Sequence, residues 1–310
     1  MEKVARYWSE PRDAAFGPEN YWAALPAVRR RLNRLTSGQE DCNWINYCLQ
    51  CYLDGRLPLP YCLSLGCGDG WLERALAAKG VFKQCDALDI APGAIERAQK
   101  KAQEAGWANI NYQVADLNTV SLPANRYDAI WMSHSYHHVA DVEHLAREIA
   151  CSLTQEGLFF LCDYVGPVRF HFPPPQRTII ERTLQLLPVS YRRLSPFAQR
   201  QEEERARLLA RNPTRAISRL YDKIRGGDLW PALWRKVRVF LWSLSGRRKG
   251  LVKNKVFLPT PYDVTSVDPS EAIRSDEILP ALRRHLEIIE FKPLGGNILH
   301  FLLDGIAHNF

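Results

Sequence analysis

Hydrophobic residues between positions 58 and 165 fall into short apolar runs that alternate with amphipathic segments. A short continuous apolar run suits a strand buried on both faces, and apolar residues spaced by three or four suit a helix. Strands separated by helices indicate a parallel sheet with helices on both sides. We therefore predict strands at 61–65, 85–90, 110–115, 127–132 and 158–162, and helices at 71–79, 92–104 and 142–153.

The segments on either side of this alternation have other patterns. Residues 1–57 are aromatic and helical in pattern and predict an N-terminal helical segment. Residues 166–262 contain a triple proline, basic helices and a tryptophan-rich stretch, and they predict a helical insertion or lid. The sequence therefore predicts one α/β domain whose core, 58–165, is interrupted by the insertion and completed by residues 263–310.

The C-terminal segment returns to a regular pattern. A helix is expected near 270–285, followed by two strands at 286–291 and 297–303. Gly295 and Gly296 stand between these strands, where a hairpin turn needs residues that accept unusual backbone angles. We predict that this helix and β-hairpin complete the sheet.

Composition narrows the class of protein. Of the 310 residues, 46% are apolar, which is enough for a large core. No apolar run of about 20 residues predicts a membrane span, and the N-terminus lacks the apolar region of a secretory signal. The eight cysteines lie mostly in apolar runs and fit reduced core residues of a cytoplasmic protein. Cys48 and Cys51 have no second pair at zinc spacing, so no metal site is expected.

Positive charge is concentrated in one segment. Residues 192–255 hold 18 Lys and Arg but 5 Asp and Glu, whereas the whole chain has a net charge of +7. Within this segment, the apolar side chains of 229–244 fall on one helical face. Two interpretations stay open: a helical lid over the site, or an amphipathic element that docks peripherally on an anionic membrane surface. A nucleic-acid surface is a third and less favoured interpretation.

Glycines follow the first predicted strand in the pattern Gly66-x-Gly68-x-Gly70 and precede a predicted helix. Such glycines allow a tight turn and let a ligand approach the backbone, although a plain strand–helix turn would look the same. Asp89 ends the second strand, 19 residues after Gly70, where a carboxylate can reach a ribose hydroxyl. Asp116 ends the third strand, where it and the next backbone amide can meet an adenine edge.

These strand ends share the carboxyl edge of a parallel sheet, where open α/β folds bind ligands. The fourth strand leads to a polar cluster, Ser133 to His138, at the same edge. Alternatively, Asp89 could cap the following helix and Asp116 could serve as a turn residue. The candidate cofactor-binding residues are Gly66, Cys67, Gly68, Gly70, Asp89, Ile90, Asp116, Leu117 and Ser133.

The glycine spacing differs from the G-x-G-x-x-G of nicotinamide-binding folds. The string Leu65-Gly66-Cys67-Gly68 resembles the class I S-adenosylmethionine-dependent methyltransferases, and 89–95 and 114–118 are similar to their second and third cofactor motifs. The resemblance implies a Rossmann-like seven-stranded sheet and S-adenosylmethionine as cofactor. Ser64 departs from the pattern, because an acidic residue is usual two positions before the first glycine.

Four further stretches resemble one bacterial branch of this superfamily, often linked to glycan or specialised metabolite pathways. They are residues 21–28, 163–170, 267–275 and 295–300. The resemblance implies a small-molecule or glycan acceptor. Asp163 stands where this branch is expected to have Glu.

An activated methyl group requires the protein mainly to align acceptor, methyl and sulfur. For an oxygen acceptor a base must also take a proton, and histidine is suited to this because its pKa lies near neutrality. The candidate catalytic residues are His134, His137 and His138. Structural roles, such as capping a helix or bonding backbone, stay open for the last two. The candidate acceptor-binding residues are Tyr136, Tyr164, Arg169 and His171.

We therefore predict O-methylation of a small molecule, glycan or lipid-linked acceptor. Two alternatives stay open. The basic segment suggests an RNA methyltransferase, although the fourth strand ends in Ser133-His134-Ser135-Tyr136 and lacks the Pro-Pro-aromatic string typical of methylation on base amino groups. Ser64 suggests a partner protein that keeps the fold without catalysis.

Overall fold

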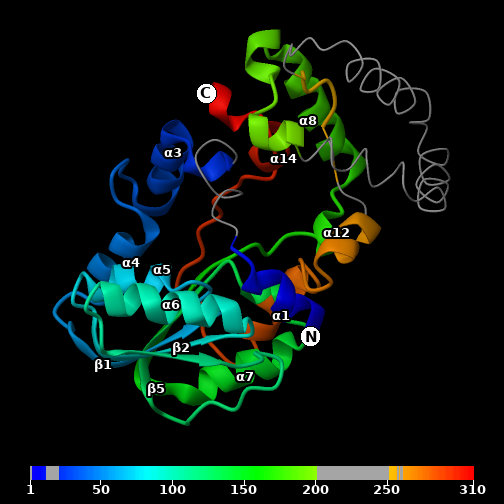
Figure 1. The fold of residues 1–310 in the computed structure, drawn as a ribbon. Coiled ribbons are helices and arrows are strands. Elements are labelled where there is room, and N and C mark those ends of the chain that lie inside the picture. Colours follow the sequence, from blue (N-terminus) through cyan, green and yellow to red (C-terminus); the bar gives the residue numbers. More distant parts are fainter. Residues whose placement is uncertain (1, 12–20, 201–250, 257, 259–260) are drawn as a thin grey trace. The chain divides into compact units, whose positions relative to one another are not determined.

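The computed structural model describes residues 2–11, 21–200, 251–256, 258 and 261–310 (Figure 1). The chain groups into two compact units, which we describe separately. The first unit comprises Met1–Arg12, Arg30–Arg177 and Leu258–Gly295. The second comprises Asp13–Arg29, Thr178–Phe257 and Gly296–Phe310. The four-segment division expected from the sequence stays a prediction.

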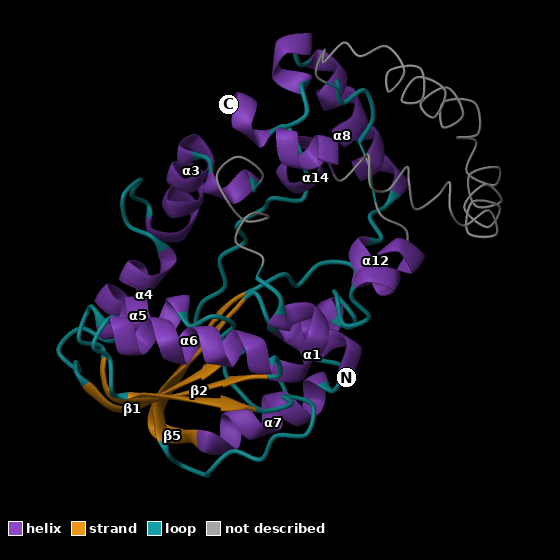
Figure 2. Ribbon diagram, viewed as in Figure 1, coloured by secondary structure: helices purple, strands orange, loops and turns teal. Residues whose placement is uncertain are grey.

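The first unit is built on one parallel sheet in the order β3-β2-β1-β4-β5 (Figure 2). Its strands are β1 (Leu59–Leu65), β2 (Phe82–Asp89), β3 (Ile110–Val114), β4 (Tyr127–Ser133) and β5 (Leu153–Cys162). The α/β class and the five core strands predicted from the sequence are confirmed. The strand order reverses between β1 and β4, so the carboxyl ends of these two strands flank the place where open α/β sheets bind ligands.

Alternate residues of the central strands pack into two separate hydrophobic cores. Leu63 of β1 and Met132 of β4 lie in one buried cluster, while Cys62 and Trp131 lie in the other. Since successive side chains of a strand point to opposite faces, both faces of β1 and β4 are covered. This explains why these strands are almost continuously apolar in sequence.

Helices cover the two faces (Figure 2). Residues of α7 lie in the cluster that contains Leu63, and residues of α5 lie in the cluster that contains Cys62. Pro92 occupies the first turn of α6, where its missing N–H costs nothing, and Asp141 caps α7 by accepting from the backbone N–H of His144. The helices are α5 (Trp71–Ala77), α6 (Pro92–Glu104) and α7 (Val142–Ser152).

The helical pattern predicted for the N-terminal residues is confirmed within the part that the structure describes. The elements are α1 (Glu2–Ser9), η1 (Trp22–Ala24), α3 (Pro26–Ser37) and α4 (Trp44–Tyr52). α1 is tied to α6, since Gly93 N–H donates to the Ser9 hydroxyl and the Arg97 guanidinium contacts the carbonyls of Trp8 and Ser9. The N-terminal helix α1, although far from the sheet in sequence, therefore lies beside the start of α6, which follows the end of β2.

The predicted C-terminal hairpin is wrong, and the seven-strand count is not confirmed: the sheet within the described residues has five strands. Residues 286–298 contain no strand, and 299–303 form a helix. In the second unit, Lys253 is buried and its ammonium donates to the carbonyls of Phe301, Leu302 and Asp304. These are carbonyls that a helix leaves unpaired at its C-terminal end. Within 270–285, helix is limited to two short elements.

Those short elements are η5 (Ser275–Glu277) and α13 (Ile278–Leu282). The remaining elements are η2 (Tyr136–His138), η3 (Val168–Phe170), α8 (Pro174–Leu186), η4 (Val189–Arg192), α12 (Pro261–Val267), α14 (Leu299–Leu303) and η6 (Ala307–Asn309).

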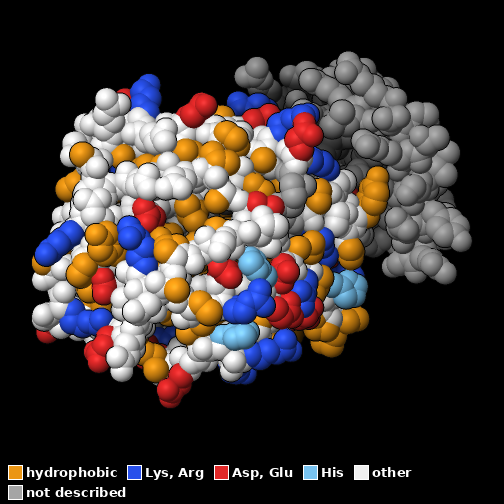
Figure 3. All heavy atoms as spheres, turned by 90° about the horizontal axis from the view of Figure 1, so that it is seen from below, with side chains coloured by type: hydrophobic (Ala, Val, Ile, Leu, Met, Phe, Trp, Pro, Cys, Tyr) orange, Lys and Arg blue, Asp and Glu red, His pale blue; other side chains and the backbone are white. Residues whose placement is uncertain are grey.

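Most of the basic segment, including the predicted amphipathic helix at 229–244, lies outside the described residues. Its assignment as a lid or a membrane-docking element stays a prediction. On the described face in Figure 3, basic and acidic side chains lie side by side. None of the helices that the structure describes is long and apolar enough to cross a membrane.

Candidate active site

The glycine loop leaves β1 and is bonded to the end of β2. Backbone N–H groups of Gly66 and Cys67 both donate to the carbonyl of Leu88. Gly66, with a φ of +66°, lies against Ser135 from the end of β4, and a Cβ there would come 2.3 Å from the Ser135 Cβ. A Cβ on Gly70 would come 2.4 Å from the hydroxyl oxygen of Tyr112. Both positions therefore require glycine for close approach.

Asp89 joins this loop to α6. One carboxylate oxygen accepts from Gly68 N–H and the other from Ala91 N–H, each at 2.8 Å. Burial raises the pKa of Asp89, although the hydrogen bonds from Ala91 and Gly68 oppose that effect. The carboxylate thus joins the glycine loop to the residue that precedes α6, without capping that helix. Its contact with a ribose stays a prediction.

The third strand's residues form the next part of the same edge. The Asp116 carboxylate accepts from the backbone and side-chain N–H groups of Asn118, so it shapes a turn. Leu117 is buried in the core, and Ile90 lies half-buried beside Asp89. At the end of β4, the Ser133 hydroxyl oxygen is buried without a hydrogen-bond partner among the described residues. A buried polar atom of this kind at a strand end suits contact with a ligand.

Ser64, which stands where an acidic residue is usual, hydrogen-bonds a carboxylate from elsewhere. Its hydroxyl contacts the carboxyl group of Glu73 on α5, and both side chains are buried. Burial raises the pKa of Glu73 to about 7, although the Ser64 hydrogen bond works against this shift. The sequence showed that Ser64 departs from the expected acidic residue, but it did not indicate that Glu73 lies beside it.

The Glu73 carboxyl predicts a pH-dependent stability. Because its folded-state pKa exceeds its ordinary value of 4.5, the stabilisation is complete below that value and is lost as pH rises through about 7. The free energy of unfolding should fall by about 2 kcal/mol between about pH 5 and about pH 8. In E73Q, which keeps an acceptor for Ser64, this part of the slope should vanish in urea titrations. An equal slope in both proteins would contradict the assignment.

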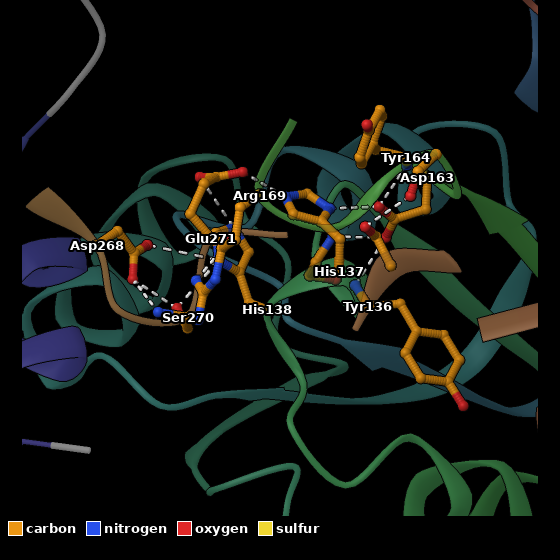
Figure 4. Close-up of polar contacts among 12 residues, drawn as sticks. Tyr136, His137, His138, Asp163, Tyr164, Arg169, Asp268, Ser270 and Glu271 are labelled. Atoms are coloured by element: carbon orange, nitrogen blue, oxygen red, sulfur yellow. Dashed lines mark hydrogen bonds and ion pairs between the residues drawn. The ribbon is translucent and has the colours of Figure 1, made fainter. Parts of the chain in front are cut away.

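Asp163, at the end of β5, organises the segment that follows β4. Its buried carboxylate accepts from the backbone N–H groups of Ser135, Tyr136 and Tyr164 and pairs with Nδ1 of His137 (Figure 4). Burial, the largest single effect, raises the pKa of Asp163, but the charge and hydrogen bond of His137, together with the charge of His134 and the Tyr136 N–H, lower it overall. The Asp163 carboxylate therefore holds the segment that follows β4 in place against the end of β5.

Glu271 lies on the other side of His137. Its Oε1 is 3.3 Å from Nε2 of His137, so both ring nitrogens face a carboxylate. Burial alone would lower the pKa of His137, but the charges and hydrogen bonds of Asp163 and Glu271 raise it to about 10. In this arrangement His137 donates from both nitrogens and does not act as a base.

His138 has a different environment. Its Nδ1 lies 3.1 Å from the Ser270 hydroxyl and 3.4 Å from Asp268 Oδ2, and its Nε2 lies 3.9 Å from Glu271 Oε2. The indole N–H of Trp8 donates to Asp268 at 2.8 Å, and the Trp8 ring packs edge-on against His138. Burial, followed by the charge of His137, lowers the pKa of His138 to about 4. His138 is therefore neutral.

The other candidate residues are not all brought to this cluster. Tyr164 lies beside His137, with its ring edge-on to the imidazole. The Arg169 guanidinium donates to the backbone carbonyl of Glu271. Tyr136 is fully buried, points away from the histidines in Figure 4 and donates to the Val142 carbonyl, so its side chain does not fit the predicted acceptor contact. His134 lies near the cluster: burial lowers its pKa, and its charge helps to lower the pKa of Asp163. His171 is exposed, and no described contact joins its side chain to the cluster.

Sequence reasoning missed Asp268, Ser270 and Glu271 as site residues. They belonged to a stretch noted for its resemblance, but no local signal placed them beside residues 137 and 138. The loops that carry the cluster are strained: Arg169 and Ala272 have φ values of 54° and 46°. Such backbone outliers cluster at functional sites.

Comparison with known proteins identifies the central part of the chain. Residues 63–161 match a family model described as Methyltransferase domain. An uncharacterized methyltransferase of Bacillus subtilis, YcgJ, is 32% identical over 34% of this chain and 41% of that protein. Aklanonic acid methyltransferase DauC of a Streptomyces species is 34% identical over 42% of this chain and 61% of that protein. A ubiquinone biosynthesis O-methyltransferase of Coxiella burnetii is 29% identical over 35% and 46%.

A parallel sheet with a glycine loop after β1 and a carboxylate ending β2 defines an α/β nucleotide-cofactor domain. Together with the family match, it makes residues 63–161 a class I S-adenosylmethionine-dependent methyltransferase domain, with S-adenosylmethionine as the methyl donor. The close approaches at Gly66 and Gly70 and the unpartnered Ser133 hydroxyl fit such a cofactor. The chain spans 41% to 61% of the length of these relatives.

Proposed function

We propose that this chain transfers a methyl group from S-adenosylmethionine to a hydroxyl oxygen of a small molecule, a glycan or a lipid-linked acceptor. The observation that carries this proposal is the meeting of the Gly66–Gly70 loop, Asp89 and Ser135 at the carboxyl edge of the sheet. The Coxiella burnetii relative is an O-methyltransferase by name, which supports oxygen as the acceptor atom.

Each part of the edge has a role in this proposal. The cofactor's sulfonium supplies an activated methyl group, so the protein's task is alignment. Asp89 would hold the ribose hydroxyls, and Asp116 and Leu117 would meet the adenine. The polar cluster around His137, which follows β4, would face the acceptor. Tyr164 and Arg169 lie beside that cluster and would orient a polar or anionic acceptor.

Calorimetric titration with S-adenosylhomocysteine tests cofactor binding. We expect D89N to weaken affinity by about tenfold to a hundredfold, the worth of hydrogen bonds to a charged group. D86N is the matched control, because Asp86 lies on the same strand but bonds Asn111 and Tyr127. Its affinity should equal that of the unaltered chain.

Methyl transfer itself is followed by mass spectrometry with phenolic, saccharide and lipid-linked hydroxyl acceptors. Cofactor binding with transfer to a hydroxyl supports the proposal. Absence of any S-adenosylhomocysteine binding by the unaltered chain would overturn it and favour a non-catalytic partner protein.

A further inference from the structure

Three side-chain atoms converge at the histidine cluster. One possible ligand atom from each of His137, His138 and Glu271 lies within 4.8 Å of the other two. Nε2 of His137 is 3.3 Å from Oε1 of Glu271, and Nε2 of His138 is 3.9 Å from Oε2 of Glu271 (Figure 4). Two atoms that each bind one cation at about 2.1 Å lie about 3.0 to 3.5 Å apart. Small side-chain adjustments therefore suffice for these atoms to share a cation.

A carboxylate orients each imidazole through its Nδ1 atom, directly for His137 and through the Ser270 hydroxyl for His138. His137 Nδ1 donates to Asp163. The Ser270 hydroxyl donates to Asp268 at 2.6 Å, which leaves its oxygen to accept from His138 Nδ1 at 3.1 Å. His138 can thus hold its proton on Nδ1 and turn Nε2 toward Glu271. His137 already turns Nε2 toward Glu271, and a cation would replace the proton that lies between them. Histidine ligands of metal ions are oriented in this way, by a hydrogen bond from the second ring nitrogen to a carboxylate or another acceptor.

The charges around the cluster are consistent with a divalent cation. Three carboxylates contact the histidines, those of Asp163, Asp268 and Glu271, and the first two are almost fully buried. The guanidinium of Arg169 lies among the same groups. Buried charges are costly unless they are paired or coordinate a metal.

We propose that His137, His138 and Glu271 bind one divalent transition-metal cation, held through the histidines by Asp163 and Asp268. Imidazole with one carboxylate favours zinc, cobalt, nickel or iron over magnesium and calcium. The proposal goes beyond methyl transfer and does not rest on it. A cation here would polarise an acceptor hydroxyl and ease loss of its proton, a task for which the doubly bonded His137 is unsuited.

A protonated His137 between two carboxylates could produce a similar arrangement without a metal. The two explanations differ at His138. A cation requires Nε2 of His138 as a ligand, whereas an ion pair between His137 and its carboxylates does not. Substitution of His138 therefore separates them.

The experiment is titration of the chelator-treated full chain with cobalt(II), followed by calorimetry and visible absorption. The spectrum matters because Cys51 and Cys151 are exposed and could bind metal through sulfur. We expect one cation per chain with nitrogen and oxygen ligation. H138Q and E271Q should each weaken affinity at least thirtyfold, and H171Q, at an exposed histidine outside the cluster, should not change it.

Thermal melts confirm that each variant is folded, and where one variant fails to fold the other decides the test. Absence of stoichiometric binding, a thiolate spectrum, or equal affinity in H138Q, E271Q and the unaltered chain would overturn the proposal. S-Adenosylhomocysteine titration of the same samples keeps this outcome separate from a failure of the proposed methyl transfer.

Discussion

Replacement of Gly66 by alanine is expected to weaken S-adenosylhomocysteine binding more than a hundredfold. The added methyl group would lie 2.3 Å from the Ser135 Cβ and 2.4 Å from its Oγ, so the glycine loop and the end of β4 must separate. Overpacking of this kind costs about 1 to 3 kcal/mol in stability, and a cofactor loop displaced by about 1 Å loses its contacts. Calorimetric titration measures the loss.

The chain offers a matched control for backbone strain. Gly80 has the same φ as Gly66, +66°, but nothing lies within 4 Å of the position its Cβ would take. G80A should therefore bear the conformational penalty of about 1 kcal/mol and bind cofactor normally. S135G removes the opposing Cβ and should restore binding to G66A. If G66A binds as tightly as G80A, the close approach is not what positions the loop.

Asp163→Asn should be the most destabilising of the substitutions considered for this chain, by about 3 to 5 kcal/mol. The buried carboxylate accepts from three backbone N–H groups and pairs with His137. An amide has one acceptor oxygen, and its NH₂ group would face donors. The strongly raised pKa of His137 would also lose its main support. Urea unfolding in the presence of chelator measures the effect on the protein itself.

The control for this prediction is the same change at Asp141. That residue caps α7 by accepting from a single backbone N–H, and asparagine caps helices equally well. D141N should lie within about 0.5 kcal/mol of the unaltered chain. If D163N lowers the free energy of unfolding by less than about 1 kcal/mol, Asp163 does not hold the segment after β4 in place.

The sheet could be predicted because its strands are buried on both faces. Residues 127–132 are apolar at almost every position, and the structure places them between two cores. The C-terminal residues could not be predicted in the same way, since a short apolar run fits a strand or a helix equally. At 299–303 the carbonyls at the end of the helix are bonded by Lys253, which lies 46 residues earlier and outside any local pattern.

The candidate site was predictable to the extent that it depends on strand ends. The glycine loop and Asp89 follow from position along β1 and β2. After β4, the sequence did not indicate which way each side chain points. There, His134 has a φ of 55°, which breaks the alternation of side chains, so Tyr136 enters the core while His137 faces Glu271. More than 130 residues separate His138 from Ser270, and no local pattern spans that interval.

The contact between Ser64 and Glu73 has a consequence for how this domain can evolve. The carboxyl group beside Ser64 comes from α5, whereas the resemblance to class I methyltransferases implies an acidic residue on the strand itself. An acidic residue introduced at position 64 would place two buried carboxyl groups together, which repel when ionised. The two positions are therefore coupled, and a substitution at either one should depend on the residue at the other.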